Sequence, residues 1–162
     1  MIDILIDDAV KNGMTSVIPP EQSIEQAVQT TLEVVHLPME QIDLCIRFAD
    51  NDAVQTLNST WRQKDSVTDV LSFPMQEVDA LDLSESLGDI ILALPFVQQE
   101  AVRLERQPHE HTLHLIIHGT LHLLGYDHIE DDDAAIMQPL ECAIMQQLHL
   151  YNPYPDLTAS HV

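Results

Sequence analysis

Positive charge is scarce in this sequence of 162 residues. Six lysines and arginines stand against 27 aspartates and glutamates, which gives a formal net charge of −21 at pH 7. Such a surface repels nucleic acid at long range. Chemistry on phosphate groups therefore requires a local positive site, and a bound divalent ion is the strongest local charge available.

Long apolar runs and paired cysteines are also missing. The longest apolar stretch, Ile90 to Leu94, is far short of the roughly 20 residues that cross a bilayer. The first residues are acidic, unlike the basic start of a secretory signal. Cys45 and Cys142 stand far apart, without the close spacing of a thiolate metal site. We therefore expect a cytoplasmic protein with free thiols.

Apolar and charged residues occur in the proportions of a folded globular chain. Apolar types make up 45% of the sequence and charged types 20%, which argues against a disordered chain. This length suits one domain. We expect that domain over residues 1–151, followed by a mobile tail at 152–162 that carries prolines and small polar residues.

Period-two patterns predict strands, and longer periodic patterns predict helices between them. The strands are expected at 1–6, 41–48, 70–73 and 88–94. The helices are expected at 23–36, 50–62, 96–106, 109–124 and 132–150. Ser23 and Gln26 have the spacing of a capping box in the first helix, Trp61 completes the inner stripe of the second, and Pro139 interrupts the last.

Six histidines crowd into twenty residues: His109, His111, His114, His118, His122 and His128. Because His118 and His122 are four residues apart, they lie on one helix face, where both rings reach one ion. Gly125 can end the helix in the left-handed conformation, and the returning chain brings His128 as a third ligand. Three imidazoles leave the fourth tetrahedral position to water, which is the arrangement of a catalytic zinc site.

The other residues of this helix permit more than one interpretation. His111 and His114 either support the metal ligands, face a substrate, or are structural. Gly119 falls in mid-helix, where glycine costs about 1 kcal/mol relative to alanine. Its presence predicts that something approaches the backbone beside the ligands, and tight helix packing is the alternative. The apolar arc with Ile116 and Ile117 is expected to pack, while the histidine arc carries the chemistry.

The histidine spacing is shared with the metzincin peptidases. Those enzymes carry a glutamate directly after the first histidine as general base. Here that position is Gly119, so the peptidase interpretation lacks its base. Water would have to be activated by the ion or by a carboxylate from elsewhere, and the sequence identifies no general base.

Three segments together resemble one known family. They read HGTLHLLGYDH at 118–128, LNSTWRQKDSVTDVLSFP at 57–74 and LGDI at 87–90. In this order they closely resemble the YbeY family, bacterial metal-dependent endoribonucleases of ribosomal RNA maturation. The resemblance covers most of residues 50–130.

The resemblance implies a fold, a site and a substrate. The fold is α+β, a single compact domain with a small mixed β-sheet packed with helices and a metal site on a helix and its following turn. One Zn²⁺ ion is held by His118, His122 and His128, and Arg62 is the functional arginine. The activity is single-strand-specific cleavage in maturation of the 3′ end of small-subunit (16S) ribosomal RNA and in ribosome quality control. It takes place in the cytoplasm.

The positive charges of Arg62 and Lys64 also suit phosphate binding, independently of the resemblance. A guanidinium presents fixed donors to phosphate oxygens and can stabilise charge that builds up in a transition state. The alternative is that both cations cap the C-terminus of the predicted helix. Nearby Asp65, Asp69 and Asp89 either orient these groups or are turn residues.

A second class of function stays open. The protein could be a ribosome-assembly factor that binds RNA without cutting it. In that case the metal would mainly stabilise the fold. In either class the net charge predicts weak binding of free single-stranded RNA. We therefore expect a basic partner, a ribosomal protein or the ribosome, to bring the acidic surface close to RNA.

Overall fold

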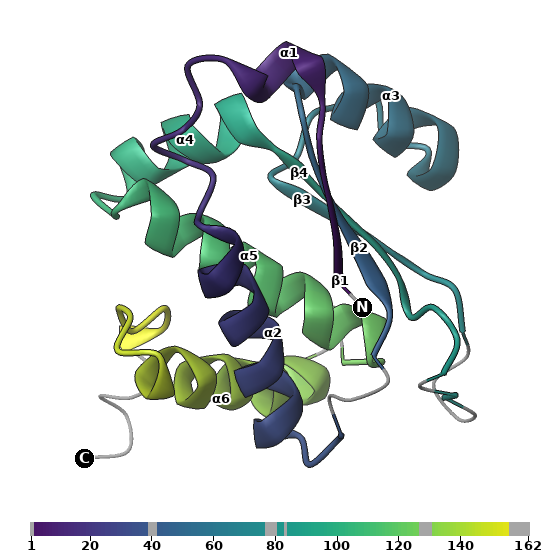
Figure 1. Ribbon diagram of the computed structural model, residues 1–162, viewed down its shortest axis with the longest axis vertical. Helices are drawn as coiled ribbons and strands as arrows, with labels where there is room; N and C mark the ends of the chain where they lie inside the picture. The colour runs from purple at the N-terminus through teal and green to yellow at the C-terminus, as the bar shows by residue number, and fades with distance from the viewer. Residues whose placement is uncertain (1, 39–41, 77–80, 83, 127–130, 156–162) are drawn as a thin grey trace.

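A computed structural model gives the fold and describes residues 2–38, 42–76, 81–82, 84–126 and 131–155 (Figure 1). Its sheet has the strand order β1-β2-β4-β3. These strands span Ile2–Ile6, Leu44–Ala49, Gly88–Ala93 and Val70–Pro74 in that order. β1, β2 and β4 run parallel, and β3 is antiparallel to β4. The expected small mixed sheet is confirmed.

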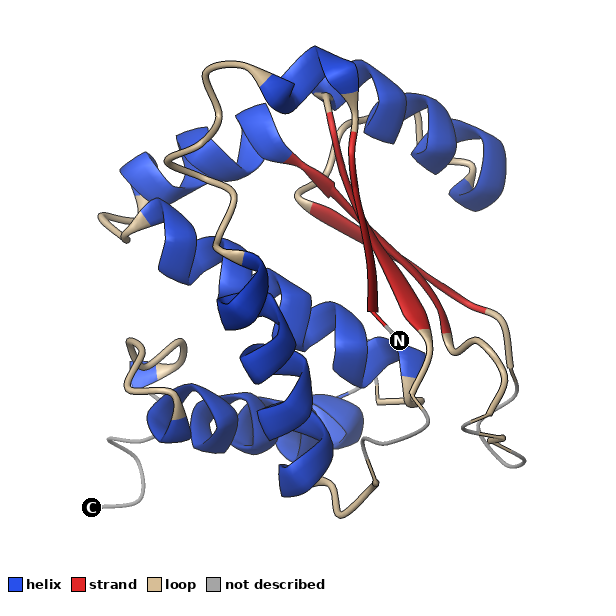
Figure 2. Cartoon of the chain, viewed as in Figure 1, coloured by secondary structure: helices blue, strands red, loops and turns tan. Residues whose placement is uncertain are grey.

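Six helices are described around this sheet (Figure 2). They are α1 (Asp8–Lys11), α2 (Glu21–Val34), α3 (Asn51–Arg62), α4 (Leu94–Arg103), α5 (Pro108–Leu123) and α6 (Asp131–Gln147). α5 packs against β3 and β4, and α2, α4 and α6 pack against α5. α3 contacts β4 separately. The expected α+β architecture, with helices packed on a sheet, is confirmed.

β4 is a central strand with both faces buried. Ile90 and Leu92 belong to the large core beneath α5, whereas Ile91 and Ala93 belong to the smaller core beneath α3. Successive side chains of a strand point to opposite faces, so a strand covered on both sides needs apolar residues throughout. This explains the continuous apolar run at Ile90 to Leu94. None of the helices described is long and apolar enough to cross a membrane.

Three local expectations were wrong. α2 begins at Glu21, directly after Pro20, so Ser23 lies inside the helix and does not cap it. Trp61 is 70% exposed and does not complete the inner stripe of α3. The short helix α1 had not been expected. Pro139 does lie inside α6, as predicted.

Candidate functional site

The central helix α5 presents the histidines. Pro108 starts it, and the Gln107 side chain accepts a hydrogen bond from the His109 backbone at 3.2 Å. Gly125 has a φ of 102° and donates its backbone N–H to the carbonyl of His122, which ends the helix as expected. The predicted histidine arc is more buried than expected, because His111 and His114 are 2% and 7% exposed. The histidines of α5 that come near the surface are His109 in the first turn and His118 and His122 in the last two turns.

His118 and His122 point toward each other. Their rings are tilted by 75° with centroids 4.6 Å apart, and the two Nε2 atoms lie 3.0 Å apart. Zinc binds imidazole nitrogen at about 2.0–2.1 Å, so nitrogens this close can share one ion. Two nitrogen lone pairs at this distance repel each other unless a proton or a cation lies between them. The contact is thus an N–H···N hydrogen bond when a proton lies between the two atoms, and the same spacing also permits a shared cation.

Glu141 of α6 contacts the His118 ring at Nδ1, on the side away from His122. Its fully buried carboxylate accepts hydrogen bonds from His118 Nδ1 and the Tyr154 hydroxyl, and from His114 Nε2 at 3.2 Å. Burial alone would raise the pKa of Glu141, but the hydrogen bonds from His114 and His118 outweigh it and lower the pKa well below the usual range. Because His118 gives its Nδ1 hydrogen to this carboxylate, its Nε2 lone pair faces His122. A carboxylate behind a ligating histidine typically orients the ring and strengthens metal binding.

The third predicted ligand, His128, lies outside the described residues. Among the residues that the structure describes, no group of three histidines, cysteines or carboxylates is placed to hold a metal. The ion predicted for His118, His122 and His128 thus rests on two positioned nitrogens and on the sequence.

Arg62 reaches the same region from the end of α3. One of its Nη atoms donates to the backbone carbonyl of Ser72, and the guanidinium carbon lies 5.5 Å from the centre of the Phe73 ring. Ser72 in turn donates its hydroxyl to the carbonyl of Gly119 at 3.4 Å. β3 therefore links Arg62 to the turn of α5 that carries His118.

Gly119 is explained by packing rather than by a ligand. A Cβ atom at this position would lie 2.9 Å from Cγ2 of Ile90 and 3.2 Å from the Ser72 hydroxyl oxygen. The glycine lets α5 approach the sheet closely, which is the alternative that the sequence left open.

These residues share one open cleft of about 740 Å³ between β3, α4 and α5. His118, His122 and Arg62 all line it, as do Lys64 and Arg106. Three of the six lysines and arginines therefore lie on one cleft of a chain with net charge −21. A local positive site exists in spite of the net charge.

A polar network forms the far wall of the cleft. His111 donates its Nε2 hydrogen to Glu100 at 2.7 Å, and its Nδ1 faces the Tyr151 hydroxyl at 3.3 Å. Burial and the nearby Arg106 guanidinium lower the pKa of His111 to about 4 and outweigh the opposing charge of Asp69. Burial, and then the charge of Glu100, raise the pKa of Asp69.

The two inner histidines have different surroundings. Tyr151 OH lies 3.1 Å from His114 Nδ1, and His114 contacts the carboxylate that holds His118. His114 thus helps to hold Glu141, the carboxylate that orients the predicted ligand His118. His111 belongs instead to the polar network around Glu100. Asp65 accepts a hydrogen bond from Gln55 at 3.2 Å and does not line the cleft. Asp89 lies in β4, opposite Cys45, and is not a turn residue.

Four residues of the site were not predicted from the sequence: Glu100, Glu141, Tyr151 and Tyr154. Glu141 carried a usable signal, because it lies four residues after Met137 and four before Met145, both of which are buried. A lone carboxylate on a buried helix stripe requires partners, and the nearby histidines supply them. Tyr154 carried none, since it falls in the segment expected to be a tail. Residues 152–155 of that segment are described, and the remaining 156–162 lie outside the described residues.

Comparison with known proteins agrees with this fold. The sequence profile of the family described as Endoribonuclease YbeY matches residues 9–149. A protein of that name from Zymomonas mobilis is 42% identical over 144 residues, covering 84% of this chain and 82% of its own. Another from Idiomarina loihiensis is 37% identical over 154 residues, covering 95% and 93%. The solution structure of TM1509 from Thermotoga maritima matches with a TM-score of 0.56 and 25% identity over 92% of both chains. The chain therefore belongs to the endoribonuclease YbeY family.

Proposed function

We propose that this protein is a zinc-dependent, single-strand-specific endoribonuclease of the cytoplasm. Its proposed task is maturation of the 3′ end of 16S ribosomal RNA and quality control of ribosomes. Membership of the family supports RNA cleavage. The observation that carries the proposal is the 3.0 Å approach of His118 Nε2 to His122 Nε2, on a cleft that also receives Arg62.

The proposed ion is held by His118, His122 and His128. When bound, zinc supplies a Lewis acid that polarises phosphate oxygens and lowers the pKa of water. Glu141 keeps His118 in the tautomer whose Nε2 can bind a metal, since it accepts the Nδ1 hydrogen. The protein's own contribution is thus an oriented pair of nitrogens in a partly buried recess.

Arg62 is proposed to hold the scissile phosphate. A guanidinium has five N–H donors, and the bond to Ser72 uses one of them. The remaining donors can bind non-bridging phosphate oxygens and stabilise the negative charge that builds up during cleavage. Contact with the Phe73 ring and with β3 restrains the side chain, so less ordering entropy is lost when phosphate binds.

Selectivity for single strands follows from the depth of the site. The His118 side chain is only 18% exposed, so a phosphate must enter the recess to reach it. A single strand can bend its backbone into a recess, whereas the two strands of an A-form helix hold each other rigid. Cleavage should therefore require unpaired RNA.

The test compares one RNA in two states. The protein is incubated with a labelled single-stranded RNA that spans the 3′ end of 16S precursor RNA, and with the same RNA annealed to its complement. The proposal expects cuts in the single strand at least tenfold faster than in the duplex. Binding without cutting of either form would favour the alternative of a metal-stapled assembly factor.

The proposed partners are single-stranded ribosomal RNA and a basic ribosomal protein or the ribosome itself. The cleft provides only Arg62, Lys64 and Arg106 for binding a polyanion, while the whole chain carries −21. A basic partner would offset the long-range repulsion and raise the rate of encounter with RNA.

A further inference from the structure

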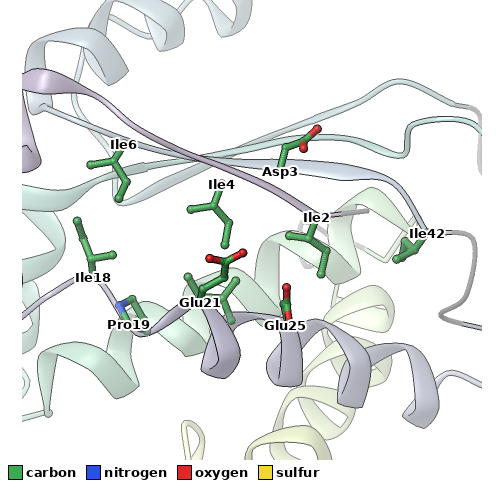
Figure 3. Close-up of a pocket in the computed structure, with 10 residues that line it drawn as sticks. Ile2, Asp3, Ile4, Ile6, Ile18, Pro19, Glu21, Glu25 and Ile42 are labelled. Carbon is green, nitrogen blue, oxygen red and sulfur yellow. The ribbon is translucent and has the colours of Figure 1, made fainter.

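A second groove lies at the opposite edge of the sheet. The RNA cleft borders β3, and the strand order β1-β2-β4-β3 places β1 at the other edge. Here a groove of about 780 Å³ runs between β1 and the start of α2 (Figure 3). A molecule bound in it would not compete with a substrate in the RNA cleft.

The groove has an apolar floor. Ile2, Ile4 and Ile6 alternate along β1 and line the groove, and Ile18 and Ile24 lie across from them. Figure 3 shows the three β1 side chains directed toward α2. Ile6 is 39% exposed, so this floor is not fully covered by the chain that the structure describes. Ile2 and Ile4 are partly buried against the core, so Ile6 is the most accessible apolar side chain of this floor.

The rim of the groove is acidic. Glu21 and Glu25 project from α2 toward β1, and Asp3 stands on β1 itself (Figure 3). All three are exposed, and no lysine or arginine is among the groove residues. Figure 3 shows Asp3 directed away from α2, so two carboxylates, Glu21 and Glu25, border the apolar floor and favour a ligand that combines apolar and cationic side chains.

The backbone of β1 adds directional hydrogen-bonding groups. β1 pairs with β2 on one side, and in the described part of the chain no strand lies on its other side. An edge strand offers its unpaired backbone N–H and C=O groups to another chain, and charges along the strand weaken that tendency. Asp3 is the one charged residue of this strand. An extended segment beside β1 would pair with these groups.

We infer that the groove between β1 and α2 binds an extended basic segment of a partner protein, which adds a strand to the edge of β1. Its alternate apolar side chains pack on Ile2, Ile4 and Ile6. Its lysines or arginines pair with Glu21 and Glu25. The inference goes beyond RNA cleavage and does not depend on it.

A binding experiment with a defined peptide tests the inference. The probe is a fluorescent eight-residue peptide of alternating valine and lysine, titrated with the full-length protein. The variant Glu25→Lys removes one rim charge, and Glu33→Lys makes the same change on α2 outside the groove. We expect roughly tenfold weaker binding for Glu25→Lys than for Glu33→Lys. Equal weakening in both variants, or no binding by the wild type, would overturn the inference.

Nuclear magnetic resonance of the same complex locates the peptide. Strand addition predicts slowed hydrogen exchange at amides of residues 2–6, whereas binding elsewhere on the acidic surface would leave them unchanged and refute the site. Dimerisation through β1 in sedimentation experiments would also refute it, because a second copy would then fill the groove. Glu25→Lys should still cleave a short RNA at the wild-type rate. A failure of the wild type to cleave would count against the proposed function alone.

Discussion

His118 donates its Nδ1 hydrogen to Glu141, across 23 residues of sequence and between helices α5 and α6. This bond directs His118 Nε2 at His122. The same carboxylate also accepts hydrogen bonds from His114 and Tyr154. The orientation of one predicted metal ligand is therefore set by three surrounding side chains.

Glu141→Gln should weaken zinc binding about 10- to 100-fold. Glutamine has nearly the same shape, but its amide NH₂ would face one of the donors that now bind carboxylate oxygen. The lost hydrogen bonds should also lower the free energy of unfolding by roughly 1–3 kcal/mol. Competition with a chelating dye measures the affinity, and urea unfolding measures the stability. The exposed Glu33→Gln is the control, and equal zinc affinity of both variants would contradict the role of Glu141.

Arg62→Ala should retain the ion and lose cleavage. Removing one preorganised charge stabiliser typically lowers the rate about 10²- to 10³-fold. Arg62→Lys should recover part of the rate, because it restores the charge but not the planar set of donors. Arg103→Ala is the control, since this side chain is 68% exposed and does not line the cleft. Wild-type cleavage by Arg62→Ala, at unchanged zinc content, would show that Arg62 has no catalytic role.

His111 should make stability depend on pH. Its pKa is lowered to about 4 in the folded protein, against 6.5 for an unperturbed histidine. As the pH falls from about 6.5 to 4, the unfolded chain takes up this proton and the folded chain does not. Stability is therefore complete above pH 6.5 and falls by up to roughly 3 kcal/mol toward pH 4.

Urea unfolding at pH 7 and pH 4.5 checks this dependence. His111→Gln should lose less stability over this range than the wild type, because glutamine does not titrate. The exposed His36→Gln should behave like the wild type. An identical pH dependence for His111→Gln and the wild type would contradict the lowered pKa.

Binding of RNA by the isolated protein should depend only weakly on salt. Three basic side chains line the cleft, namely Arg62, Lys64 and Arg106. Each neutralised phosphate of a single strand contributes about −0.7 to the slope of log K against log salt, so we expect a slope near −2. Titrations from low to physiological salt measure it. A slope steeper than about −4 would mean that more cations engage RNA than this cleft provides.

Much of the fold could be predicted because its periodic patterns are strong. A strand was predicted at 88–94, which the structure buries on both faces, and alternation from Ile42 to Phe48 predicted its neighbour. The start of α2 was misplaced because Pro20 directs the chain into the helix without a side-chain cap. Trp61 was misplaced because helical periodicity cannot tell whether a partner covers the last turn of a helix.

The candidate site was predictable only where its members lie close in sequence. His118 and His122 are four residues apart, and helix geometry alone brings them together. Glu141 stood out as a lone carboxylate on a buried helix stripe, but no local pattern shows that packing of α6 and the segment after it brings Glu141 and Tyr154 to the histidines. Gly119 looked like a place for a ligand to approach, but its neighbours are Ile90 and Ser72 of the sheet.

The most direct test of the account is cleavage of single-stranded RNA by one preparation before chelation, after chelation and after return of zinc. Circular dichroism and metal content are recorded on the same samples. The account predicts that the stripped protein stays folded, loses cleavage and regains it with zinc, and that His122→Ala is not restored. Wild-type cleavage by a folded sample in which mass spectrometry detects no metal would contradict the account.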